Sequence, residues 1–121
     1  MAKNLEVSFL LDFYGEMLTE KQREAVESYY FEDLSLAEIA DNQGISRQGV
    51  RDAIKRSETL LFEMEERLGL AKRFREIQEG LKMISKAAQA IADYNNRCGY
   101  STELRKQVAV IQDTVQKLCE E

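Results

Sequence analysis

Six polar and basic side chains lie close together in an otherwise acidic sequence, and their chemistry suits the recognition of nucleic acid. They are Ser46, Arg47, Gln48, Arg51, Lys55 and Arg56. Arg and Lys neutralise phosphates, while Arg and Gln form paired hydrogen bonds with the edges of guanine and adenine. A serine at the start of a helix, with the unpaired N–H groups there, binds a phosphate. The sequence therefore predicts a DNA- or RNA-binding surface at these residues.

The distribution of charge along the chain supports this prediction. The 121 residues have a formal charge of −5, which as a whole argues against nucleic acid. Residues 1–45, however, contain three Lys or Arg and ten Asp or Glu, whereas residues 46–57 contain four basic residues and one acid, Asp52. Residues 58–121 are nearly balanced. The simpler interpretation, in which these charges form only the solvated face of an amphipathic helix, stays open at this point.

The surrounding residues have the spacing of a helix-turn-helix. Such a unit needs a small residue where two helices touch, a turn residue that tolerates positive φ, and apolar residues behind the second helix. Ala40, Gly44 and Val50 occupy these positions. The other members of the apolar set are Ile39, Ile45 and Ile54. The second helix is then a recognition helix, whose first residues meet base edges while later ones meet phosphates.

Capping signals and apolar periodicity predict an all-α chain, in which residues 1–69 form the helix-turn-helix domain. Its helices are expected at about residues 5–17, 20–31, 36–41 and 47–68. Capping boxes at Thr19 and Ser35, an N-cap at Ser46 and a left-handed stop at Gly69 set these bounds. The complete lack of proline agrees with a chain built of helices.

Residues 70–121 are predicted to form a C-terminal arm of long helices, arranged as a hairpin. Apolar residues recur there at steps of three and four, as in coiled coils. The two stripes are Leu70, Phe74, Ile77, Leu81, Ile84, Ala88 and Ile91, then Leu104, Val108, Ile111, Val115 and Leu118. A turn-rich stretch at 95–101 separates them, with Ser101 and Thr102 as candidate caps. The stripes pair either within one chain or across a dimer interface, and we expect a homodimer.

The sequence argues against an enzyme, a metal site or another cofactor. It contains no histidine, which removes the commonest general base and metal ligand. Glu63, Glu65 and Glu66 are expected to form a solvated helix end. Cys98 and Cys119 do not form a disulfide scaffold, so we expect reduced thiols and a cytoplasmic protein. No stretch approaches the roughly 20 apolar residues of a membrane span.

Residues 18–70 closely resemble the YlxM family of small helix-turn-helix proteins of Gram-positive bacteria, and the preceding FLLDFYGEM also fits. Within this region, LAEIADNQGISRQGV is similar to the DNA-binding helix-turn-helix of sigma factors. The resemblance implies a sigma-factor-like bundle, related to a winged helix but without a wing. It does not imply promoter reading, because nothing resembling the other sigma domains is present.

The resemblance also implies a place in the signal recognition particle pathway. YlxM-like proteins are typically encoded beside the GTPase of that particle and are proposed to act in, or regulate, its pathway. The implied partners are the protein or the RNA of the particle. Two functions follow: a regulatory, nucleic-acid-binding helix-turn-helix protein, or a protein-interaction module that modulates the GTPase without binding DNA.

Overall fold

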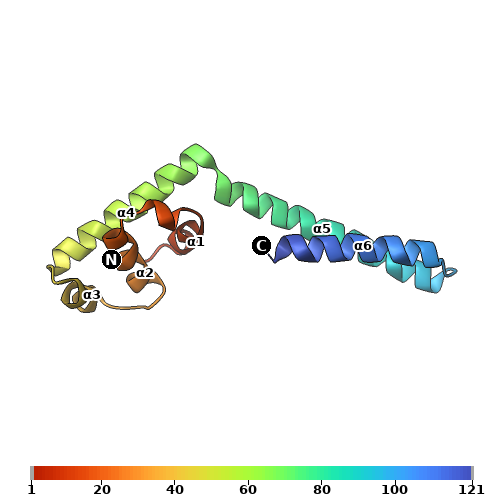
Figure 1. The fold of residues 1–121 in the computed structure, drawn as a ribbon, viewed down its shortest axis with the longest axis horizontal. Coiled ribbons are helices and arrows are strands. Elements are labelled where there is room, and N and C mark those ends of the chain that lie inside the picture. The colour runs from red at the N-terminus through yellow and green to blue at the C-terminus, as the bar shows by residue number, and fades with distance from the viewer. Residues whose placement is uncertain (1, 121) are drawn as a thin grey trace. The chain divides into compact units, whose positions relative to one another are not determined.

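The computed structural model describes residues 2–120, and every regular element among them is a helix (Figure 1). The all-α prediction is therefore confirmed. In chain order the elements are α1 (Leu5–Tyr14), the 3₁₀ turn η1 (Gly15–Met17), α2 (Glu20–Tyr30), α3 (Leu36–Gln43), α4 (Arg47–Leu68), α5 (Leu70–Arg97) and α6 (Thr102–Cys119). The described residues form two compact units, which divide after Lys72.

Helix α4 is the central element of the N-terminal unit, where it packs against α1, α2 and α3. Its core-facing residues Val50, Ile54 and Leu61 are fully buried. The other buried apolar side chains of this core are Val7, Leu10, Leu11, Tyr14, Leu18, Ala25, Val26, Tyr29, Ile39, Ala40 and Ala71. Because one face of α4 is held by three helices, its opposite face is left for solvent or a ligand.

Most of the helix ends lie where the local signals predict. Both capping boxes form: the Thr19 and Ser35 hydroxyls accept the N–H groups of Gln22 and Glu38, whose side chains return the bonds. Gly69 ends α4 in the left-handed conformation, as expected. Two ends differ from the prediction. Helix α1 stops at Tyr14 and tightens into η1, which lets Leu18 turn into the core, and α3 continues to Gln43, immediately before its left-handed C-cap.

The junction of α4 and α5 is held by hydrogen bonds that the sequence analysis missed. The buried Tyr14 hydroxyl donates to Glu65 Oε1 at 2.6 Å and accepts the Leu70 N–H at 3.1 Å. The two Glu65 oxygens accept the N–H groups of Ala71 and Lys72, each at 3.0 Å. The expectation of a solvated Glu65 is therefore wrong, because this carboxylate caps the first turn of α5. Burial, followed by the bond to Glu65, raises the pKa of Tyr14.

Replacing Tyr14 by Phe is expected to lower the free energy of unfolding of the N-terminal unit by about 1–3 kcal/mol, because a carboxylate and an N–H lose a buried partner. Urea denaturation followed by circular dichroism measures the change. Hydrogen exchange should accelerate at the amides of residues 70–72. Tyr94→Phe is the matched control, because the same hydroxyl is removed from an exposed side chain. Equal effects of the two substitutions would contradict the role given to Tyr14.

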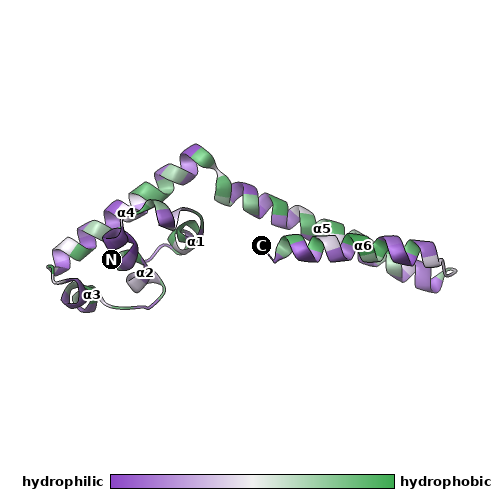
Figure 2. Cartoon of the chain, in the orientation of Figure 1, coloured by the Kyte–Doolittle hydropathy of each residue, from purple (hydrophilic) through white to green (hydrophobic). Residues whose placement is uncertain are grey.

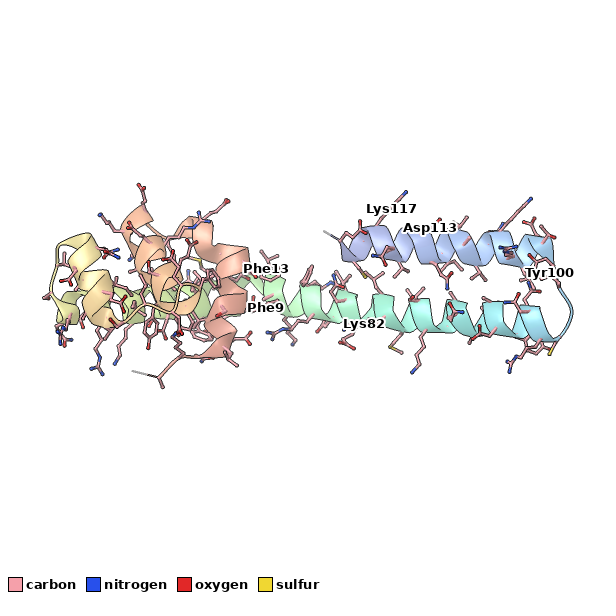
Figure 3. All side chains as sticks on the ribbon, turned by 90° about the horizontal axis from the view of Figure 1, so that it is seen from below. Phe9, Phe13, Lys82, Tyr100, Asp113 and Lys117 are labelled. Atoms are coloured by element: carbon pink, nitrogen blue, oxygen red, sulfur yellow. The ribbon has the colours of Figure 1, made fainter. Side chains whose placement is uncertain are left out.

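In the C-terminal unit, α6 runs antiparallel beside α5 (Figures 1 and 3). The buried Asn95 fixes the connection, because its amide donates to Ser101 O at 3.0 Å and accepts the Ser101 N–H at 2.9 Å. Ser101 then caps α6 by accepting the Leu104 N–H. Hydrophobic and hydrophilic residues alternate around both helices (Figure 2).

Three further observations concern the chemistry of the described residues. None of the helices at residues 2–120 is long and apolar enough to cross a membrane. Over the same residues, no group of three or more Cys, Asp or Glu side chains could hold a metal ion. Cys98 and Cys119 are both free and exposed.

Candidate nucleic-acid interface

Helices α3 and α4 form the predicted helix-turn-helix. Gly44 adopts the left-handed conformation, with φ 68° and ψ 32°, and its N–H donates to Ala40 O. The Ile45 N–H donates to the same carbonyl at 3.1 Å. Ala40 and Val50 are buried where the two helices meet. The turn therefore fixes the direction in which α4 leaves α3, and with it the face that α4 exposes.

Ile45 does not join the core as the sequence analysis expected. Its side chain is 46% exposed, because it lies over Gly49 at the start of α4. A Cβ on Gly49 would lie 3.6 Å from Ile45 Cδ1 and 3.2 Å from Ser46 Oγ. Gly49 is thus a structural residue of the site that was missed. A glycine in the first turn of a helix was the available signal, since glycine is unfavourable in a helix unless close packing requires it.

Ser46 caps the recognition helix and leaves its N-terminus open to an anion. The Ser46 Oγ accepts the Gly49 N–H at 2.9 Å, so its own O–H remains available as a donor. Helices α1, α2 and α3 each have an acidic residue in the first turn, but α4 has none. The partial positive charge at the start of α4 is therefore not compensated locally, which favours a phosphate there.

The four basic residues of the predicted surface all project from α4 into solvent. Arg47, Arg51 and Lys55 follow one another at four-residue spacing, which places them in a row along one face, and Arg56 adjoins Lys55. Their side chains have no ion pair or hydrogen bond within the part of the chain that the structure describes. Four solvated cations are thus free to meet phosphates without first breaking an intramolecular bond.

Gln48 differs from these residues, because its side chain is already engaged. Its amide donates to Asp52 Oδ1 at 2.9 Å, one turn further along α4. Both residues are exposed, so the bond can open toward a base at little cost. The amide oxygen of Gln48 still accepts, whereas the carboxylate of Asp52 repels a phosphate placed directly above it. Asp52 therefore limits where a backbone can lie on this face.

Glu58 is the other acidic group close to the basic row. It is half-buried, and burial raises its pKa, while a hydrogen bond with Tyr30 and then the charge of Lys55 act in the opposite direction. Its Oε1 is buried without a hydrogen-bond partner in the described residues. Glu58 therefore lies close enough to offset part of the charge of Lys55.

The sequence matches a known protein family. Residues 1–99 match the family model described as "UPF0122: Putative helix-turn-helix protein, YlxM / p13 like". The matched region contains the whole N-terminal unit and all of α5, and it ends before α6.

Several curated relatives show the same similarity. A UPF0122 protein of Thermoanaerobacter sp. (strain X514) is 49% identical over 89 residues, which cover 74% of this chain and 76% of the relative. A UPF0122 protein of Symbiobacterium thermophilum is 48% identical over 85 residues, covering 70% and 77%. A UPF0122 protein of Bacillus cereus (strain AH187) is 43% identical over 93 residues, covering 77% and 82%.

Proposed function

This chain belongs to the UPF0122 family of YlxM / p13-like helix-turn-helix proteins, and we propose that it is a regulatory protein that binds nucleic acid through α4. The proposed contacts are Ser46, Arg47, Gln48, Arg51, Lys55 and Arg56. Ser46 and the start of α4 hold a phosphate, Gln48 and the two nearest arginines face base edges, and Lys55 and Arg56 anchor phosphates. This role needs no catalytic residue and no cofactor.

One observation carries the proposal: the exposed face of α4 is basic, with four Lys or Arg and one acid at residues 46–57, whereas residues 1–45 contain three basic residues and ten acids. Its cations are unpaired within the described residues, and the start of the helix lacks an acidic residue. A purely solvated face would gain stability from acids at this helix start and from alternating charges along it. The arrangement instead favours an anionic ligand. The acidic remainder of the unit repels other phosphates and so limits nonspecific binding.

The test is a fluorescence anisotropy titration of the full chain with labelled duplex DNA and with structured RNA. Four cations brought against the nucleic acid, at its phosphates or at its base edges, predict a slope of log K against log salt of between about −3 and −4. Affinity should then fall about 100-fold between about 50 and about 200 mM salt. Undetectable binding to both ligands at low salt, or a salt-independent affinity, would contradict the proposal.

We further propose, from the family resemblance, that the chain takes part in the signal recognition particle pathway, with the RNA of the particle as the nucleic acid. The alternative is a protein-interaction module that modulates the GTPase of the particle without binding DNA. The acidic surface of residues 1–45, which binds no nucleic acid in the first proposal, supports that alternative. A change in GTP hydrolysis that persists after charge reversal on α4 would select the protein-interaction function.

The predicted homodimer is also part of the proposal. The apolar stripes of residues 70–121 offer more surface than one antiparallel pair of helices buries, since many of their members stay exposed. A dimer would present two recognition helices and so two nucleic-acid-binding sites per dimer. Sedimentation of the full chain at tens of micromolar, roughly where modest interfaces associate, measures the mass directly.

A further inference from the structure

Only half of each apolar stripe is used where α5 and α6 meet. The buried residues of that seam repeat every seven positions and are small or medium in size. They are Leu81, Ala88 and Asn95 on α5, with Val108 and Val115 on α6. Seven residues are about two helical turns, so each set lies in one line along its helix. The pairing of α5 with α6 within the chain therefore depends on these lines.

The other half of each stripe is exposed and has the same repeat. Its members are Ile77, Ile84 and Ile91 on α5, with Leu104, Ile111 and Leu118 on α6. We call these six residues the hairpin face. Their exposed fractions lie between 38% and 50%. Six half-exposed aliphatic residues at regular spacing exceed the scattered apolar residues of an ordinary surface and are typical of an interaction site.

The six residues lie on the same side of the hairpin. Each of the six residues lies three positions after a seam residue or four positions before one. On both helices, this places the row of the hairpin face about 50° around the helix axis from the line of seam residues, in the same rotational sense. Because the two helices are antiparallel, equal rotations turn both rows toward one common face. The opposite edge of the seam is polar, since Gln112 there donates to Gln89 Oε1 at 2.9 Å.

Between the members of each row, on the outer side of the hairpin face, lie four residues without charge. They are Gly80 and Ala87 on α5, with Gln107 and Thr114 on α6. Gly80 is unexplained within the chain, because no described atom lies within 4 Å of where its Cβ would be. Glycine weakens a helix interior, and its usual compensation is the close approach of another helix.

We propose that a second copy of this chain docks its own hairpin face here, so that two hairpins form a four-helix bundle. The four uncharged residues let two acidic chains meet at the middle of the face without like-charge repulsion. Because the rows on α5 and α6 have the same spacing, the hairpin face is complementary to a second copy of itself, as an interface with two-fold symmetry requires. Twelve half-exposed Ile and Leu side chains offer on the order of 1,000 Å², the lower bound for a specific interface.

The inference rests on the proposed homodimer and assigns its surface. Sedimentation equilibrium of the full chain is expected to show a dimer at tens of micromolar, roughly the range of modest interfaces. Ile84→Glu/Ile111→Glu should weaken dimerisation at least about 100-fold, because four charges would enter an apolar interface. The matched control is Met83→Glu/Val110→Glu, which should stay dimeric. These side chains are 71% and 60% exposed and lie about half a turn from the seam, on the outer sides of the helices.

A second variant distinguishes a loss of dimerisation from a loss of folding. Gly80→Gln adds bulk at an open position of one chain and leaves all six side chains of the hairpin face intact, so it should preserve helicity by circular dichroism and still weaken the dimer. A monomeric wild-type chain would overturn both the homodimer and its surface. A dimer unaffected by Gly80→Gln and by Ile84→Glu/Ile111→Glu would overturn the surface alone. Nucleic-acid binding by a monomer would leave the function proposed for α4 standing.

Discussion

Reversing the charge of both Arg47 and Arg51, to Glu, is expected to weaken the binding of DNA or RNA about 100-fold at low salt. Two phosphate or base contacts are lost, and two negative charges are placed where the backbone would lie. The slope of log K against log salt should also fall by about 2, one for each lost cation. Anisotropy titrations at several salt concentrations measure both quantities.

The substitutions should leave the fold intact. Both side chains are exposed and unpaired within the described residues, so their loss removes no contact that stabilises the N-terminal unit. A glutamate at position 47 also lies in the first turn of α4, where a negative charge favours the helix. Circular dichroism and the urea midpoint should therefore match those of the wild-type chain. Any loss of affinity then reports on binding rather than on folding.

The matched control changes the net charge by the same amount elsewhere. Lys82 and Lys117 are exposed cations of the C-terminal unit, labelled in Figure 3. Lys82→Glu/Lys117→Glu should reduce affinity only weakly, through the long-range field of the protein. If the two double variants weakened binding equally, the overall charge of the chain, and not the face of α4, would drive association.

Replacing Ile54 by Ala is expected to cost about 2–5 kcal/mol of the stability of the N-terminal unit. Ile54 is fully buried on α4, the helix against which α1, α2 and α3 all pack. Deleting its outer atoms leaves a cavity at the centre of the helix-turn-helix. Because small domains have only about 5–15 kcal/mol in total, a substantial part of the stability should be lost.

The control for this prediction is Ile45→Ala, since the sequence assigned both isoleucines to the core. Ile45 is half-exposed and covers Gly49, so the expected loss is less than about 1 kcal/mol. Urea denaturation gives both values, and hydrogen exchange along α4 shows whether the loss lies in the N-terminal unit. Similar losses for the two variants would contradict the packing described for the turn.

Short-range interactions explain why so much of the helix-turn-helix could be predicted. The caps at Thr19, Ser35 and Ser46 join atoms three residues apart, and the left-handed Gly44 serves a turn of a few residues. Such contacts depend on the local sequence alone. The exposed position of the basic row follows in the same way, from helical periodicity opposite Val50 and Ile54.

Contacts between distant segments could not be predicted in this way. Tyr14 and Glu65 are 51 residues apart, and no local pattern indicates that a tyrosine of α1 meets the end of α4. Ile45 was assigned to the core because apolar residues usually are. Its exposure depends instead on the absence of a side chain at Gly49 and on the direction of the turn.

The sequence by itself determined the all-α class, the helix-turn-helix and the basic face of its second helix, because these depend on residue type and on interactions within one or two helical turns. The tertiary structure decided which half of each C-terminal stripe is buried and which is left exposed. A stripe of period three and four shows that a helix has an apolar side, but only the position of the neighbouring helix divides that side into a filled seam and an open face.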